Sequence, residues 1–211
     1  MFYDREEGGR LLAQLLTQYK DSKDVLVLGL PRGGVVTAYE VAKSLHLPLD
    51  VICPRKIGAP NNPEYAIGAV TETGEGVFNE AEIERLGIPD SFLKASIAEQ
   101  TKEAHARLKL FRSGKKPLIL KDKRVIIVDD GIATGLTMKA SIQSLRKSGA
   151  KEIVVAVPVA PPESIIEIET LADQVFCLLT PPNFYAVGQF YQVFGQTSNE
   201  EVIELLISKD T

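Results

Sequence analysis

The sequence has no tryptophan, only two cysteines and only two histidines among its 211 residues. With so few cysteines and no CxxC pair, it is not a disulfide-rich scaffold. We expect Cys53 and Cys177 to be buried free thiols, and a disulfide between them is the less favoured alternative. His46 and His105 fall on predicted helices and share no motif. We therefore expect surface or helix-end histidines rather than metal ligands or a catalytic base.

An excess of positive charge and long hydrophobic runs are also missing. The formal net charge is −4 at pH 7. We therefore expect no general attraction to nucleic acid or to an anionic membrane, and any phosphate-binding surface must be local. No apolar run approaches the roughly 20 residues that cross a bilayer. The N-terminus is polar and acidic early, so we expect no signal peptide and a cytoplasmic location.

Strand and helix patterns alternate along the chain, without an internal repeat or a low-complexity tract. The predicted strands share continuous apolar runs: 25–30, 49–53, 124–130, 152–160 and 174–179. The predicted helices share apolar residues at helical spacing: 5–20 (capped by Asp4), 33–46, 90 to about 112, 134–150 (stopped by Gly149), 162–172 and a last helix capped near Ser198. This alternation favours the α/β class, with a parallel β-sheet flanked by helices on both faces.

Residues 54–76 have the proline, glycine and asparagine content of a long loop, with a short hairpin-like piece at 64–70. A loop of this length is either a lid over a binding site or a disordered connection, and its residues favour neither.

The stretch "VIIVDDGIATGLT" at 125–137 ends an apolar strand with two carboxylates, Asp129 and Asp130, followed by a loop of small residues. Free backbone N–H groups at the start of the next helix favour an anion, and Thr134 and Thr137 add hydroxyl donors. This loop is suited to one phosphate monoester. The carboxylates would repel that phosphate, so they must accept hydrogen bonds from a neighbouring group that is rich in donors.

Two neighbouring ribose hydroxyls fit the two carboxylates, and so does Mg²⁺ held through water or through those hydroxyls. The stretch therefore predicts a ribose-5-phosphate site. The alternative is that Asp129 and Asp130 only cap the helix that follows.

Two further loops follow predicted strands. "LPRGG" at 30–34 offers backbone N–H groups and the forked donor of Arg32. Arg55 and Lys56 open the loop after the strand at 49–53. Each signal alone is weak, but together they suit a second anion such as a diphosphate. Competing motifs fail: GxGxxG and GxSxG are absent, and Leu136 stands where a P-loop would need lysine.

"VIIVDDGIATGLTM" closely resembles the phosphoribosyl diphosphate motif of type I phosphoribosyltransferases. "LPRGG" occupies the place of that family's diphosphate loop, and "RKIGAPNNPEYAIGAV" the place of its flexible loop. The resemblance covers the core, about 22–180, and is most specific at 125–138. The whole chain, including its "FYAVGQFYQVF" tail, is also similar to a subgroup of predicted phosphoribosyltransferases.

The resemblance implies roles for individual residues. Asp129 and Asp130 would hold the ribose hydroxyls and, indirectly, Mg²⁺. The 5-phosphate would be wrapped by neighbours on the same loop: Gly131, Ala133, Thr134, Gly135, Leu136 and Thr137. The diphosphate would be held by Arg32, Gly33 and Gly34, with a cis peptide beside Arg32. Arg55 and Lys56 would close over the leaving diphosphate, and together with the two aspartates they are the predicted catalytic residues.

The resemblance also implies an architecture. We expect one domain over 1–211, in which the tail from about 181–211 and the N-terminal segment 1–20 form a small hood that holds the acceptor. Phe184, Tyr185, Phe190 and Tyr191 are candidates to stack on a planar base, or else they anchor the tail or form a dimer contact. Family members suggest a homodimer.

One departure from the family pattern concerns the base. Ala133 occupies a position where purine-salvage members can carry an aspartate, which makes a hypoxanthine or guanine preference doubtful.

The predicted function is transfer of a phosphoribosyl group from its diphosphate donor to an unidentified nitrogenous base, with Mg²⁺. The alternative is a non-catalytic regulatory protein that keeps the donor site as a sensor. A third, weaker interpretation takes "IIVDD" as the acidic pocket of a phosphorelay receiver. The glycine-threonine loop directly after Asp130 disfavours it.

Overall fold

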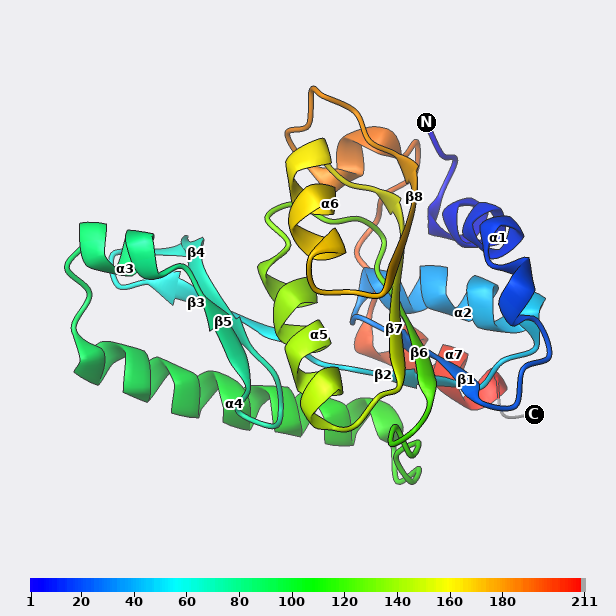
Figure 1. Cartoon of the computed structure of the whole chain (residues 1–211), viewed down its shortest axis with the longest axis horizontal. Helices are drawn as coiled ribbons and strands as arrows, with labels where there is room; N and C mark the ends of the chain where they lie inside the picture. The colour runs from blue at the N-terminus through cyan, green and yellow to red at the C-terminus, as the bar shows by residue number, and fades with distance from the viewer. Residues whose placement is uncertain (210–211) are drawn as a thin grey trace.

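The computed structural model describes residues 1–209 and contains two β-sheets (Figure 1). The central sheet is fully parallel, with the strand order β2-β1-β6-β7-β8. Its strands are β1 (Val25–Gly29), β2 (Leu49–Val51), β6 (Arg124–Val128), β7 (Glu152–Val159) and β8 (Gln174–Leu179). Each lies within a run that the sequence marks as a strand, so the predicted α/β class is confirmed.

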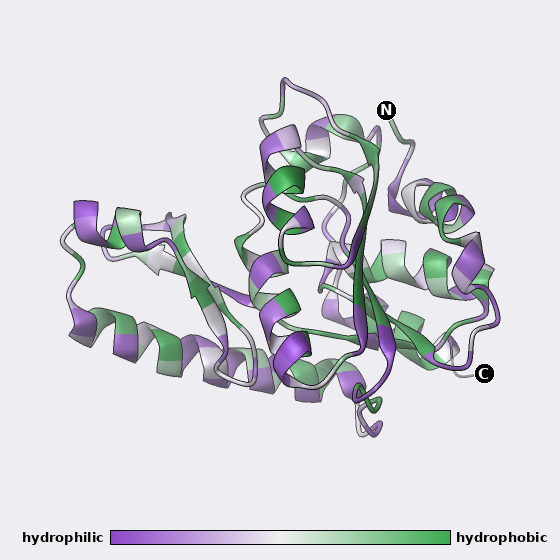
Figure 2. Ribbon diagram, viewed as in Figure 1, coloured by the Kyte–Doolittle hydropathy of each residue, from purple (hydrophilic) through white to green (hydrophobic). Residues whose placement is uncertain are grey.

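Helices cover both faces of the central sheet (Figure 1). One face carries α1 (Arg5–Leu15), α2 (Gly33–Leu45), α7 (Asn199–Ser208) and the C-terminal part of α4 (Asp90–Arg112). The other face carries α5 (Leu136–Lys147) and α6 (Pro162–Glu169). Within β6, Val125 and Ile127 pack with the α5 and α6 layer, and Ile126 and Val128 pack with the opposite layer. Burial on both sides explains why these strands are continuously hydrophobic, as Figure 2 shows.

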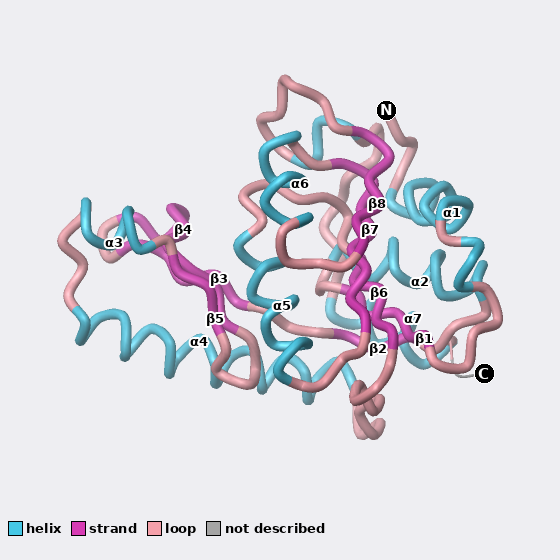
Figure 3. Tube along the Cα trace, viewed as in Figure 1, coloured by secondary structure: helices cyan, strands magenta, loops and turns pink. Residues whose placement is uncertain are grey.

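A second, antiparallel sheet stands to one side of the central sheet (Figures 1 and 3). It consists of β3 (Arg55–Ala59), β4 (Asn62–Val70) and β5 (Gly76–Phe78), and it is followed by α3 (Glu80–Arg85). We call residues 55–97 the arm. Its own apolar cluster is small: Ile57, Ala59, Ile67, Val70 and Ile88 are buried, with five partly buried neighbours.

The prediction of a long loop over 54–76 is therefore wrong, and only the hairpin-like piece at 64–70 is correct. Two of the glycines that suggested a loop allow close packing inside the strands. A Cβ on Gly68 would lie 2.6 Å from Cδ1 of Phe78, and one on Gly58 would overlap the carbonyl oxygen of Pro63. Glycine in a strand often marks such a close approach or a bulge, and the β3–β4 register shifts at Gly58.

The N-terminal segment lies beside the part of the tail around 187–191, next to β8. Phe2 pairs with Tyr191 in an isolated bridge, and its N–H donates to the carbonyl of Phe190 at 2.8 Å. The tail also contains a short 3₁₀ helix, Val187–Phe190. The predicted caps of α1 and α7 are confirmed, because Asp4 and Ser198 accept from backbone N–H groups three residues ahead. The first helix is shorter than predicted, since it ends at Leu15 and a 3₁₀ turn follows.

Both cysteines are free thiols, as predicted. Cys53 is buried, whereas Cys177 is only half-buried, so full burial was wrong for Cys177. Burial raises the pKa of both thiols, that of Cys177 to about 11. Neither thiol is therefore suited to nucleophilic work. No helix within residues 1–209 combines the length and hydrophobicity needed to cross a membrane.

Candidate functional site

The loops after β1 and β6 meet at one edge of the central sheet. β1 and β6 are neighbours in the sheet, and the N–H of Leu30 donates to the carbonyl of Val128 at 3.0 Å. A Cβ on Gly34 would lie 2.5 Å from Oδ1 of Asp129 and 2.8 Å from its Cα. A Cβ on Gly33 would overlap the Asp130 carboxylate. Only glycine allows the loop at 30–34 to approach the acidic pair this closely.

The two carboxylates of the acidic pair, Asp129 and Asp130, have different surroundings. The Asp129 Oδ1 atom accepts the N–H of Asp130 at 2.8 Å. Burial raises the pKa of Asp129 well above its usual range, and the neighbouring charge of Asp130 raises it further. A nearby donor or cation would favour the ionised form of this group, as a ribose hydroxyl or a magnesium ion would.

Asp130 is held by residues of the N-terminal helix and of the tail. Nε of Arg5 donates to its Oδ2 at 2.6 Å, and both side chains are largely buried, 12% and 15% exposed. The Arg5 guanidinium also donates to the carbonyl of Gly195 at 2.8 Å and lies 3.8 Å from the centre of the Phe194 ring. The Tyr191 hydroxyl donates to the Asp130 carbonyl at 2.6 Å. The N-terminal segment and the tail thus brace the acidic pair.

Arg5 and Tyr191 both fall in the predicted hood. The sequence did not predict that either of them contacts the acidic pair. The positions are 125 and 61 residues away from Asp130 along the chain. No local motif signals either contact. The sequence does show an arginine within the first turn of the first helix, and that is the only available hint.

The loop at 131–137 leads directly into α5. Gly135 is the N-cap of that helix with φ of 74°, and no side chain caps the helix start. The first N–H groups of α5 therefore remain available to an anion. Ala133 and Thr134 are exposed, and Leu136 and Thr137 are half-buried. The alternative in which the two aspartates only cap this helix is wrong, because the cap position is Gly135.

Arg55 and Lys56 point to different surroundings, as adjacent residues of a strand do. Nε of Arg55 donates to Oε1 of Gln100 on α4 at 3.2 Å. Lys56 pairs with Glu64 at 2.9 Å and lines a cavity of about 800 Å³ between the arm and the core. Thr134 and Leu136 of the 131–137 loop line the same cavity. The structure thus brings Lys56 toward the predicted 5-phosphate loop and Arg55 toward α4.

Arg32 is exposed and follows a cis peptide bond between Pro31 and Arg32, as the resemblance implied. The hood aromatics are separated. Phe184 stacks on Phe190, with ring centres 5.3 Å apart, and packs in the cluster around Phe2. Tyr185 is 89% exposed. Phe184 therefore anchors the tail, and Tyr185 is the one that is free to meet a ligand.

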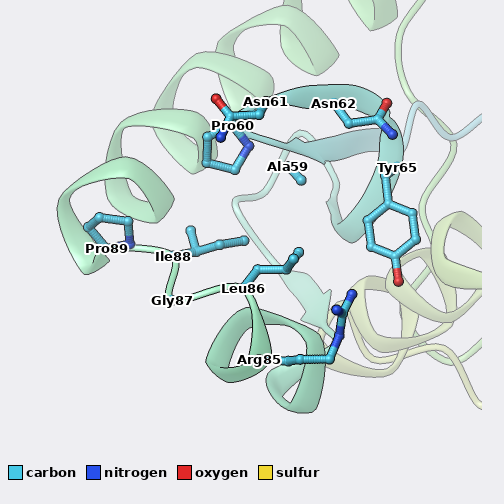
Figure 4. Close-up of a pocket in the computed structure, with 10 residues that line it drawn as sticks. All are labelled: Ala59, Pro60, Asn61, Asn62, Tyr65, Arg85, Leu86, Gly87, Ile88 and Pro89. Carbon is cyan, nitrogen blue, oxygen red and sulfur yellow. The ribbon is translucent and has the colours of Figure 1, made fainter.

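A second cavity, of about 470 Å³, lies within the arm (Figure 4). Its polar side chains include Tyr65 and Arg85, which Figure 4 shows pointing toward one another. Both donate to the carboxylate of Glu82, Tyr65 at 2.7 Å and Arg85 through Nε at 3.1 Å. These donors are already in use, and the cavity lacks both glycine loops. We therefore place the candidate site at the edge of the central sheet.

Within residues 1–209, no group of three or more histidine, cysteine, aspartate or glutamate side chains is arranged to hold a metal ion. A metal at the acidic pair would need further ligands from substrate and water. The pair itself supplies hard oxygen donors, which fit Mg²⁺ better than a softer metal.

Comparisons with known proteins identify the family and the fold. The sequence matches the family model described as a phosphoribosyl transferase domain over residues 3–194. A Mycobacterium tuberculosis H37Rv protein, "Putative phosphoribosyl transferase Rv0571c", is 46% identical over 206 residues, 98% of this chain and 46% of that protein. The chain thus spans about half the length of the curated relatives it matches. The crystal structure of TT1426 from Thermus thermophilus is 40% identical, covers 98% of both chains and superposes with a TM-score of 0.82.

Proposed function

The chain belongs to the phosphoribosyl transferase family, and from this premise we propose that it transfers a 5-phosphoribosyl group from phosphoribosyl diphosphate to a nitrogenous base, releasing diphosphate. One observation carries the proposal. The loop at 30–34 packs directly on the acidic pair, which leads into an uncapped helix start. Two anion-binding loops on either side of two carboxylates match a sugar that carries a phosphate at one end and a diphosphate at the other.

Each part of the donor has a complementary group in this proposal. The N–H groups at the start of α5, with Thr134 and Thr137, bind the 5-phosphate. Asp129 and the free oxygen of Asp130 accept hydrogen bonds from the ribose hydroxyls. The backbone at Gly33 and Gly34, with Arg32, binds the diphosphate. Gly131 also allows the tail to pack closely on this loop, since a Cβ there would lie 2.6 Å from Cγ1 of Val187.

The chemistry follows from charge. Breaking the bond between the anomeric carbon and the diphosphate oxygen leaves positive charge on the sugar and negative charge on the leaving group. The side chains of Arg32 and Arg55 stabilise the leaving diphosphate, and the aspartates lie beside the sugar. When bound, Mg²⁺ supplies further positive charge to the diphosphate, and Asp129 and Asp130 would hold it through water or the ribose hydroxyls.

The acceptor belongs to the hood in this proposal. Tyr185 stacks on a planar base, while Phe184 keeps the tail in place. Ala133 provides no carboxylate for a purine, so we do not favour hypoxanthine or guanine. We further propose that 1–211 acts as one domain and that the protein forms a homodimer, which size-exclusion chromatography with light scattering will test.

The test is calorimetric titration with phosphoribosyl diphosphate and Mg²⁺, followed by a screen of bases for diphosphate release. We expect magnesium-dependent binding that the Asp129→Asn/Asp130→Asn double variant abolishes. The matched control is Glu169→Gln/Glu204→Gln, which removes two exposed carboxylates elsewhere. Unchanged binding by the aspartate double variant refutes the ribose site. Donor binding without turnover on any base would instead favour the sensor function.

A further inference from the structure

Three arginines from different elements converge where β1 and β2 end. The two strands are adjacent and parallel, and the N–H of Ile52 donates to the carbonyl of Gly29 at 3.2 Å. The chain therefore leaves both strands at the same edge of the sheet. Arg32 follows β1 by three residues and Arg55 opens β3 just beyond β2.

The third arginine is Arg107 on α4. Figure 1 shows α4 as the long helix that runs from the arm beneath the core, and it packs on both β2 and β3. Gln100, the residue that accepts from Arg55, precedes Arg107 by seven positions. Seven residues are about two helical turns, so Gln100 and Arg107 lie on the same face of α4. That face is turned toward β3 and the end of β2.

The electrostatics agree with this placement. Burial lowers the pKa of Arg107, and the nearby positive charges of Arg55 and Arg32 lower it further. Arg107 also acts on the thiol of Cys53, two residues beyond β2, by opposing the rise of its pKa. Its guanidinium therefore lies close to the carboxyl end of β2.

The cluster has no carboxylate paired with Arg107 or Arg32. Arg107 is half-buried, yet within residues 1–209 neither its guanidinium nor that of Arg32 has an ion pair or hydrogen bond. Glu103, one turn earlier on α4, raises the pKa of Arg107 less than the two arginines lower it. Three like charges brought together repel one another and leave several N–H donors unused. An anion with several oxygens would remove both costs.

We propose that Arg107 is a third arginine of the anion site and binds the donor's diphosphate together with Arg32 and Arg55, an inference that rests on the proposed function. A diphosphate has enough oxygens to accept from several forked donors at once. Arg107 belongs to α4, and the N-terminal part of α4 lies in the arm. Diphosphate binding at Arg107 therefore links the arm to the core.

The experiment compares Arg107→Gln with Lys109→Gln, which removes one exposed positive charge from another face of the same helix. The probes are inorganic diphosphate with Mg²⁺, ribose 5-phosphate and phosphoribosyl diphosphate, each titrated by calorimetry at one ionic strength. We expect Arg107→Gln to weaken diphosphate binding about tenfold to a hundredfold, as for a lost charge-assisted contact. Ribose 5-phosphate affinity should stay unchanged, and Lys109→Gln should match the wild type for all probes.

A second variant, Arg107→Lys, keeps the charge but not the fork, and we expect intermediate diphosphate affinity. If Arg107→Gln does not fold, the diphosphate affinity of Arg107→Lys tests the proposal instead. Diphosphate affinity equal to the wild type in both variants overturns the role of Arg107, even if the donor binds. If diphosphate binding depends on Arg107 but phosphoribosyl diphosphate and ribose 5-phosphate do not bind, the anion site stands and the proposed function fails. A wild-type protein that binds none of the three overturns both.

Discussion

The central sheet and the arm bury their hydrophobic residues in different ways. Each strand of the central sheet lies between two layers of helices, so β6 buries Val125 through Val128 without interruption. The arm has one small cluster, and its β4 strand is exposed over its first four residues. One region is a core that other parts pack on. The other is an extension held to the core mainly through α4 and through contacts of α5 with β4 and β5.

The same contrast appears in charge. The core contributes the acidic pair and the glycine loops, whereas the arm contributes Arg55 and Lys56. A donor that carries both hydroxyls and phosphates would bridge the two regions. We therefore expect substitutions in the core to affect global stability, and substitutions in the arm to affect local opening and anion binding.

The largest expected effect is that of Ile127→Ala in β6. Ile127 is fully buried between the sheet and the α5 and α6 layer. We expect a loss of about 4 kcal/mol, from lost burial and the remaining cavity. Thermal or urea unfolding should show it as a single cooperative shift. A loss below about 1 kcal/mol would mean that this layer repacks freely, contrary to its close packing.

The matched substitution in the arm is Ile67→Ala, because Ile67 is also fully buried. We expect a smaller local effect, about 2 to 3 kcal/mol, because a small cluster can partly collapse around the cavity. Hydrogen exchange should accelerate in β3, β4 and β5 while β1 and β6 keep their protection. Equal acceleration in both sheets would show that the arm is not a separate stability unit.

The central sheet could be predicted from sequence because strands buried on both faces are hydrophobic at every position. The β3–β5 sheet could not, because its strands contain Gly58, Gly68 and Gly76, residues that usually mark turns. The reason for Gly68, the nearby Phe78 ring, exists only once β4 and β5 pair. Within 54–76, only the hairpin-like piece at 64–70 was recognised.

The third effect concerns the close approach of the two loops. In Gly34→Ala the new Cβ would lie 2.5 Å from Oδ1 of Asp129, so one of the two loops must shift. We expect about 2 kcal/mol of destabilisation and a marked loss of donor affinity. Gly195→Ala is the control, since a Cβ there meets nothing within 4 Å. If Gly34→Ala binds the donor with wild-type affinity, the 30–34 loop is not part of the donor site.

The meeting of Gly34 with Asp129 was predictable, because parallel strands deliver their following loops to one edge. The Arg5 contact with Asp130 was not, since it joins residues from opposite parts of the chain and depends on how the tail returns to the N-terminus. The face of α4 that carries Gln100 was equally hidden, because β3 itself was read as loop. The roles assigned to the site residues stay predictions.

The fourth effect is that of Arg5→Gln. This variant leaves the largely buried Asp130 carboxylate without its cation and loosens the contact with Phe194. We expect about 1 to 2 kcal/mol of destabilisation, together with faster hydrogen exchange in the tail. Arg10→Gln on the same helix is the control, since its pairs with Glu6 and Glu40 are longer and its side chain is half-exposed. Equal stability of the two variants would show that Arg5 does not brace the acidic pair.

The smallest expected effect is acid sensitivity, and it compares one partly exposed ion pair from each region. A hydrogen bond from Arg124 lowers the pKa of Asp24, the residue just before β1 of the central sheet. Hydrogen bonds from Arg85 and Tyr65 lower the pKa of Glu82 in the arm. A carboxyl group whose pKa is lower in the folded state stabilises the fold above its unfolded pKa. That contribution is lost as the pH falls through the folded pKa.

We therefore expect Asp24→Asn and Glu82→Gln to be slightly less stable than the wild type at pH 7, and to approach it below about pH 4. The effect of Asp24→Asn should appear in global unfolding, because its partner Arg124 is the first residue of β6. The effect of Glu82→Gln should appear only in hydrogen exchange of the arm, because Glu82 and both of its partners belong to it. If Glu82→Gln lowers the global unfolding temperature as much as Asp24→Asn does, the arm and the core unfold together and the distinction between them fails.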